Sequence, residues 1–189
     1  MYRAVGWKAI EEGVALDSEP LVAALAARAV YQQADGKITI DGHDVTRAIR
    51  TPEMDKAAAS VARLPQVRDV LVAQQRAMGA EGGVVMEGRD IGTVVFPEAD
   101  LKIYIDASAE ERARRRAGDS AHTGSQAGLT NVQSDMAARD RSDSTRPVAP
   151  LTKAADAIFI DTTDMPIEAV VHHVMMLIFE KLHPLSEGR

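Results

Sequence analysis

A chain of 189 residues is long enough to bury one substantial hydrophobic core. The absence of cysteine excludes disulfides, thiol catalysis and cysteine-ligated metal sites, and it agrees with a reducing, cytoplasmic location. A formal net charge of -6 argues against a nucleic-acid polymer as partner, because such binders usually carry a basic face. No apolar run approaches the roughly 18 residues of a membrane span, so we expect no membrane-spanning helix.

Two helices are expected at the start of the chain. Residues 2–12 predict a helix that ends at Gly13. A second helix follows the capping residue Asp17 or Ser18. The apolar positions of this second helix that are spaced for burial are Leu21, Leu25 and Ala29.

Antiparallel strands interrupt the helices at residues 30–45. The turn at 35–36 has the Asp-Gly sequence of a two-residue hairpin loop, and we interpret the hairpin as a small insertion. Two more helices are expected over residues 51–63 and 65–78, each with a proline in its first turn. The inward-facing positions of the later helix are Val67, Leu71 and Met78.

Two short runs rich in β-branched residues, 84–86 and 101–105, predict buried parallel strands covered on both faces. A third strand is expected at 157–160. Open α/β sheets bind ligands beyond the carboxyl ends of their strands. Charged residues lie directly after the first two runs: Glu87, Arg89 and Asp90, with Gly88 among them, follow the first run, and Asp106 follows the second. We therefore expect a binding crevice at this edge of the sheet.

The next segment predicts a pair of polar helices joined by a loop. Ser108 and Glu111 form a capping box at the start of the first helix. Residues 118–130 hold almost nothing to bury and predict a mobile loop or lid tip, and a polar helix follows over 131–146. The arginines of the first helix are Arg112, Arg114, Arg115 and Arg116.

The final helix follows Asp164 and carries a broad apolar stripe. We expect Met175 and Met176 to fill the core. His172 and His173 are expected to be partly exposed, and we assign them no role.

Arginines near the predicted strand and helix ends are the residues best suited to chemistry. A guanidinium group binds phosphate through two parallel hydrogen bonds and keeps its charge, so several arginines around one crevice favour phosphoryl transfer. Two plainer interpretations stay open: residues 139–146 can form a solvated helix face, and Gly88-Arg89-Asp90 can be a simple turn. The residues concerned are Arg89, Arg139 and Arg146, with Asp90, Asp140 and Asp143 beside them.

The chain resembles the bacterial cytidylate kinase family in several independent segments, in order, from Met1 to about Leu182. The matching segments are Met1–Arg3, Ala59–Arg68, Glu87–Pro97, Ile105–Arg116 and Arg139–Leu151. The resemblance implies an α/β fold, the parallel-sheet, P-loop NTPase-like fold of nucleoside monophosphate kinases. It also implies a single domain over 1–189, with an antiparallel insertion at about 30–65 and a lid at about 112–146.

The function implied by the resemblance is ATP-dependent and Mg²⁺-dependent transfer of a phosphoryl group to CMP or dCMP by a cytoplasmic, monomeric kinase. The resemblance places the monophosphate on Arg3 and Arg89, with Tyr2 in the wall of that site. It assigns cytosine to Ser60, Arg68 and Asp90, and the ribose to Asp143 with Arg139. Arg139 and Arg146 would neutralise the transferred phosphoryl group, so the catalytic arginines are Arg89, Arg139 and Arg146. Arg112 and Arg116 would face ATP, and no metal ligand is assigned.

The chain departs from this family in one respect, because the motif Gly-x-x-x-x-Gly-Lys-[Ser/Thr] occurs nowhere in its 189 residues. That loop holds the phosphates of ATP and its hydroxyl holds magnesium. We therefore expect an N-terminally shortened cytidylate kinase in which phosphoryl transfer is impaired. The alternatives are a catalytically silent CMP-binding module and a non-functional fragment.

Overall fold

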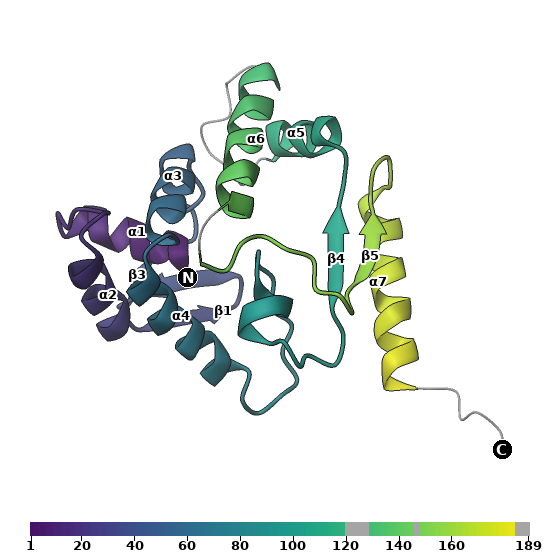
Figure 1. Ribbon diagram of the computed structural model, residues 1–189, viewed down its shortest axis with the longest axis horizontal. Coiled ribbons are helices and arrows are strands. Elements are labelled where there is room, and N and C mark those ends of the chain that lie inside the picture. The colour runs from purple at the N-terminus through teal and green to yellow at the C-terminus, as the bar shows by residue number, and fades with distance from the viewer. Residues whose placement is uncertain (120–128, 146–147, 184–189) are drawn as a thin grey trace.

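The computed structural model describes residues 1–119, 129–145 and 148–183. Figure 1 shows a helical N-terminal part, a pair of helices (α5 and α6) above it, and a strand pair with a final helix at the other side. The helices are α1 (Tyr2–Glu11), α2 (Glu19–Arg28), α3 (Pro52–Val61), α4 (Pro65–Met78), the short π-helix η1 (Ile91–Val95), α5 (Ala109–Gly118), α6 (Leu129–Thr145) and α7 (Ile167–Leu182). The strands are β1 (Tyr31–Ala34), β2 (Lys37–Ile40), β3 (His43–Asp44), β4 (Ile103–Asp106) and β5 (Ile158–Asp161).

Four helices form the main core, and the predicted inward positions Leu25, Val67 and Leu71 are buried in it. The fully buried members come from α1, α2, α3 and α4, and they include Val5, Leu25, Val61, Val67 and Leu71. Helices α1 and α3 pack closely, because Gly6 offers no side chain: a Cβ atom there would lie 2.9 Å from the Cβ of Ala57. The start of α3 is fixed by Thr51, whose hydroxyl accepts a hydrogen bond from the amide of Met54 at 3.2 Å.

The predicted hairpin is confirmed, and it forms a small antiparallel sheet in the order β1-β2-β3. Tyr31 pairs with Ile40, and Ala34 pairs with Lys37 across the two-residue turn. Both turn residues have positive φ, 51° at Asp35 and 73° at Gly36, as a type I′ turn requires. The sheet packs on a second cluster of buried residues, which are Ala4, Ala29, Ile40, Val45 and Ile49.

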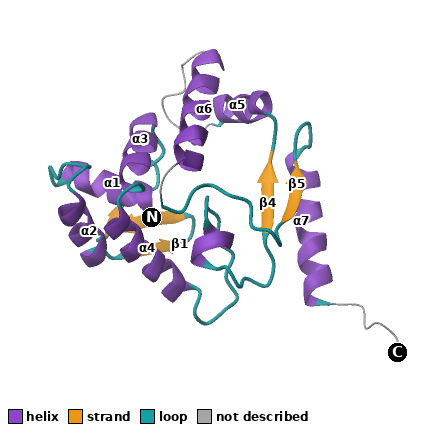
Figure 2. Ribbon diagram, in the orientation of Figure 1, coloured by secondary structure: helices purple, strands orange, loops and turns teal. Residues whose placement is uncertain are grey.

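The expected parallel pairing is also confirmed, because β4 and β5 run side by side in the same direction. Figure 2 shows these two strands beside α7, apart from the N-terminal sheet. The sheet ends at Asp106 and Asp161, which are in register. The capping box is present too, since the Ser108 hydroxyl accepts a hydrogen bond from the amide of Glu111 at 3.2 Å.

The prediction of a buried strand at 84–86 is wrong. These residues form no strand, and the side chain of Val85 is 93% exposed. The chain enters the segment through Gly82 and Gly83, which both have positive φ, and in the described residues β4 pairs only with β5. An apolar run becomes a strand only where a neighbouring strand supplies hydrogen bonds.

Several predictions of burial are wrong for a related reason. Met175 and Met176 lie on the exposed side of α7, and Phe159 of β5 is 52% exposed, so the strands are not covered on both faces. Leu21 of α2 and Met78 of α4 are exposed as well. Apolar spacing shows which side of an element favours burial, but it does not supply the element that covers it. In the described ranges, no helix has both the length and the apolar character that a bilayer span needs.

Candidate functional site

The site is centred on a carboxylate that lies among three arginines. Asp55, on the first turn of α3, forms ion pairs with Arg3 of α1, Arg116 of α5 and Arg139 of α6. The Nη1 atom of Arg139 lies 3.1 Å from Oδ1 of Asp55. We call these four residues the Asp55 cluster. Close packing of α1 on α3 at Gly6 and Ala57 brings the first turns of both helices together, which is why Arg3 reaches Asp55.

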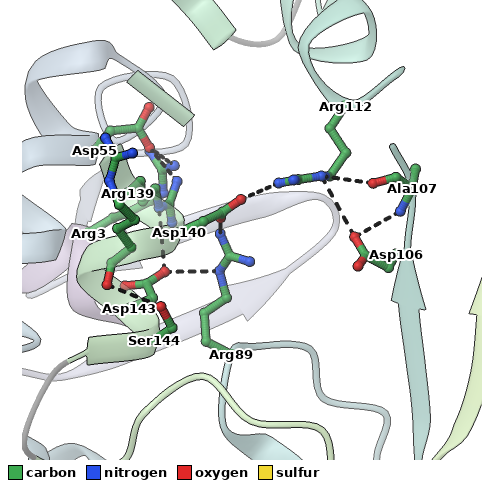
Figure 3. Close-up of polar contacts among 11 residues, drawn as sticks. Arg3, Asp55, Arg89, Asp106, Ala107, Arg112, Arg139, Asp140, Asp143 and Ser144 are labelled. Carbon is green, nitrogen blue, oxygen red and sulfur yellow. Dashed lines mark hydrogen bonds and ion pairs between the residues drawn. The ribbon is translucent and has the colours of Figure 1, made fainter. Parts of the chain in front are cut away.

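A second set of ion pairs adjoins the Asp55 cluster along α6. Asp140 lies between Arg89, which precedes η1, and Arg112 of α5 (Figure 3). The distance from Nη2 of Arg89 to Oδ1 of Asp140 is 3.4 Å. One turn later, Oδ2 of Asp143 lies 3.3 Å from Nε of Arg89 and 3.9 Å from Nε of Arg139. Arg139 and Asp143 therefore join the two sets of ion pairs.

Strand β4 orients the arginine at the start of α5. The Nε atom of Arg112 donates to the carbonyl oxygen of Ala107 at 3.0 Å and lies 3.7 Å from Oδ1 of Asp106. Because Asp106 ends β4, the carboxyl end of this strand faces Arg112, so the predicted crevice has one of its two expected strand ends. Arg112 and Arg116 are one helical turn apart, so both point to the same side of α5.

A buried ion pair lies beside this network. Arg68 of α4 and Asp90, at the start of η1, are 3% and 8% exposed and form an ion pair through Nη2 and Oδ2. The guanidinium carbon of Arg68 lies 5.6 Å from the centre of the Tyr2 ring, within the range of a cation–π contact. Tyr2 and Asp90 are the chain neighbours of Arg3 and Arg89, so the buried pair is tied directly to the arginine network.

Positive charge exceeds negative charge around Asp55, since three guanidinium groups of the described residues face this carboxylate. Burial lowers the pKa of the Arg3 guanidinium from its ordinary value; Asp55 opposes this shift, whereas the charges of Arg139 and Arg116 lower the pKa further. An arginine stays protonated despite such a shift. The cluster is therefore a cationic site that favours an anionic ligand with several oxygens.

Two cavities border the network. One, of about 440 Å³, opens between α5 and α6 and is lined by Arg112, Arg115, Arg116, Asp119 and Met136. The other, of about 280 Å³, adjoins the buried pair and includes Arg68, Arg76 and Val94 in its lining. The first shares Arg112 and Arg116 with the ion-pair network, and the second shares Arg68 with the buried pair.

The structure brings most of the predicted site residues together, although they come from distant parts of the chain. Ser60 is not among them: it lies on the exposed side of α3, and its hydroxyl donates to the carbonyl oxygen of Lys56 on the same helix at 3.1 Å. Arg146 lies outside the described residues. The residues that converge are Tyr2, Arg3, Arg68, Arg89, Asp90, Arg112, Arg116, Arg139 and Asp143.

Sequence reasoning missed Asp55. An acidic residue in the first turn of a helix is common, because it interacts favourably with the helix dipole. Asp55 therefore gave no signal that distinguished it from Glu53 in the same turn.

The described part of the chain contains no group of three or more histidine, aspartate or glutamate side chains that could hold a metal ion. The carboxylates of the network are paired with arginines instead. The residues present thus fit the phosphate groups of a ligand better than they fit a bare cation.

Comparison with known proteins identifies relatives over almost the whole chain. The family model described as cytidylate kinase matches residues 1–180. The cytidylate kinase of Desulfitobacterium hafniense is 45% identical over 185 residues, which cover 96% of this chain and 80% of that protein. The cytidylate kinase of Pelotomaculum thermopropionicum is 48% identical over 180 residues, covering 93% of this chain and 80% of that protein. A bifunctional pantoate ligase/cytidylate kinase of Synechococcus elongatus is 45% identical over 186 residues, covering 94% of this chain and 35% of that protein.

Proposed function

The chain belongs to the cytidylate kinase family, and we propose that it transfers the γ-phosphoryl group of ATP to CMP or dCMP, giving CDP or dCDP. One observation supports this proposal above the others. Arginines from α1, the segment before η1, α5 and α6 meet in one network beside a buried arginine–aspartate pair. A monophosphate and a polar nucleobase need these two environments next to each other.

In this proposal the monophosphate of the acceptor binds to Arg3 and Arg89. Both guanidinium groups already contact carboxylates, so they are held at positions where an anion is favoured. In the transfer step an oxygen of that monophosphate attacks the γ-phosphorus of ATP, and the bond to the leaving ADP oxygen breaks. Arg139 would neutralise the transferred group, since positioning and charge stabilisation provide most of the catalysis in phosphoryl transfer. Arg146 has the same proposed role.

Cytosine would be recognised by Arg68 and Asp90, with Tyr2 as the neighbouring wall. Cytosine presents an exocyclic amine beside two acceptors, and a carboxylate is the usual acceptor for that amine. A guanidinium group next to the carboxylate supplies donors for the two acceptors. Asp143 would accept hydrogen bonds from the ribose hydroxyls, because its carboxylate lies on the same side of α6 as Arg139.

ATP would bind on the side of α5, where Arg112 and Arg116 line the cavity of about 440 Å³. These residues fit the polyphosphate of ATP through charge. Magnesium commonly enters kinase sites bound to substrate phosphates and waters, with only one or two protein carboxylates. We assign no magnesium ligand in this chain.

For these 189 residues by themselves, a second candidate is a catalytically silent module that binds CMP. The observation that favours it is the lack of a Gly-x-x-x-x-Gly-Lys-[Ser/Thr] motif in the sequence. In kinases of this type the backbone and lysine of that loop hold the ATP phosphates.

Two measurements test the proposal. Isothermal titration calorimetry with CMP is expected to show one binding site, and Arg89→Gln is expected to weaken binding at least tenfold. An ADP-release assay with CMP, dCMP and UMP then separates the kinase from the binding module. Release of ADP that depends on CMP supports the kinase, whereas CMP binding without ADP release supports the module. Absence of CMP binding would contradict both.

A further inference from the structure

Asp55 occupies the position at which the surrounding arginines would place an anionic ligand. Its two carboxylate oxygens accept from guanidinium groups on three different helices, with Arg3 and Arg139 on Oδ1 and Arg116 on Oδ2. The side chain is 19% exposed, so solvent reaches it only in part. Guanidinium groups bind carboxylates and phosphates with the same planar, paired donor geometry.

We propose that the Asp55 carboxylate is an internal substitute for a phosphate group, which holds the arginines in the ligand-free protein and is displaced when phosphate binds. This inference rests on the proposed function, because it concerns the phosphate of the acceptor nucleotide. Asp55 then lowers the affinity of the site for its ligand, since binding must first break three ion pairs.

The charges of the cluster determine the direction of this exchange. A phosphate monoester carries about −1.5 to −2 charges at neutral pH and three acceptor oxygens, whereas a carboxylate carries one charge and two oxygens. The larger anion is therefore the better partner for three guanidinium groups. Phosphate and carboxylate within a few ångströms would repel each other strongly at low local dielectric, so both are not expected to stay among the same donors.

The exchange also changes what connects the helices. In the ligand-free protein Asp55 ties α5, through Arg116, and α6, through Arg139, to α3. With phosphate in its place, the same arginines connect α5 and α6 to α1 through the ligand and Arg3. The position of the α5–α6 pair thus becomes dependent on the nucleotide.

The test is Asp55→Asn, which removes the charge and nearly preserves the shape. Calorimetry compares the variant with wild type for three ligands: CMP, inorganic phosphate and cytidine. For CMP and phosphate, the dissociation constants of the variant are expected to be at least tenfold lower than those of wild type. Cytidine lacks the phosphate, so its dissociation constant should be unchanged. Glu53→Gln is the matched control, because Glu53 is an exposed acid in the same turn of α3, and it should change these constants less than twofold.

Equal or weaker phosphate binding by Asp55→Asn overturns the inference. If wild type binds CMP and the variant binds it equally well, the inference fails while the proposed function stands. If neither protein binds CMP but the variant binds inorganic phosphate more tightly, the inference stands and the proposed function fails.

A measurement on wild type alone covers the case in which the variant does not fold. The carboxyl carbon resonance of Asp55 should move when inorganic phosphate is added, because its ion pairs break. If the Arg3 guanidinium resonance moves and that of Asp55 does not, the inference is overturned.

Discussion

Substitution of Arg68 by methionine should destabilise the protein strongly. The change keeps most of the side-chain volume but leaves the carboxylate of Asp90, which is only 8% exposed, without its buried cationic partner. Removing one member of a buried pair typically costs about 3–5 kcal/mol in the free energy of unfolding. For a chain of this size each kcal/mol lowers the melting temperature by roughly 2–4 °C, so we expect a decrease of about 10 °C.

Urea unfolding followed by circular dichroism measures this cost, and two further variants identify its cause. Arg50→Met removes an exposed arginine and should change the free energy of unfolding by less than about 0.5 kcal/mol. The double variant Arg68→Met/Asp90→Asn removes both charges of this buried pair and should recover at least half of the loss. Two results would refute the assignment of Arg68 and Asp90 as a buried, mutually dependent pair. One is a decrease in the free energy of unfolding for Arg68→Met no larger than that for Arg50→Met, and the other is a double variant no more stable than Arg68→Met.

Two further predictions concern Asp41 and Ser60. Hydrogen bonds from Lys8 and from the amide of Val30 lower the pKa of Asp41. The Asp41 carboxylate therefore binds a proton less readily in the folded chain than in the unfolded chain. This shift stabilises the folded chain above the ordinary carboxylate pKa, and the stabilisation is lost as the pH falls through the lowered value. Asp41→Asn should therefore reduce the dependence of the free energy of unfolding on pH between roughly pH 3 and 6. If the slope of unfolding free energy against pH is unchanged in Asp41→Asn, Asp41 does not cause this pH dependence. Asparagine is a suitable replacement because it tolerates the positive φ of this position. Ser60→Ala should change the dissociation constant for CMP less than twofold, because the hydroxyl is bonded to Lys56 of its own helix, and a tenfold loss in calorimetry would show that Ser60 reaches the ligand.

Features with a local cause could be predicted from the sequence. The Asp35-Gly36 turn has one strongly preferred geometry, and the hairpin around it follows. The capping box at Ser108 depends on residues three apart in the same turn, so it needs no information about the rest of the fold. The parallel pairing of β4 and β5 followed from their short apolar sequences and the helices between them.

Two features that depend on packing between distant segments could not be predicted. The run at 84–86 has the composition of a buried strand, but whether it pairs is decided by the strands beside it. In the sequence, Asp55 looks like any acidic residue in the first turn of a helix. Only the packing of α1, α3, α5 and α6 makes it the centre of a cluster. Arg139 was predicted from its chemistry, and Arg3 and Arg116 from the resemblance to the cytidylate kinase family, whereas their carboxylate partner was not predicted.

The close contact of Gly6 with Ala57 leads to a prediction in which helix propensity and packing oppose each other. Propensity alone predicts that Gly6→Ala stabilises α1 by about 1 kcal/mol. The added Cβ would lie 2.9 Å from the Cβ of Ala57 and 3.3 Å from its carbonyl carbon, so α1 and α3 must separate. Overpacking of this kind typically costs about 1–3 kcal/mol, which exceeds the gain.

The separation also has a consequence at the site, because Arg3 lies one turn before Gly6 and Asp55 lies two residues before Ala57. We expect Gly6→Ala to lower the melting temperature and to weaken CMP binding in calorimetry, since Arg3 moves with α1. The double variant Gly6→Ala/Ala57→Gly moves the missing side chain from α1 to α3, so the two helices can pack closely again and CMP binding should be restored. Its stability should stay below that of wild type, because a glycine within α3 is destabilising. If Gly6→Ala instead raises the melting temperature and leaves CMP binding unchanged, the position of Arg3 does not depend on the close approach of these two helices.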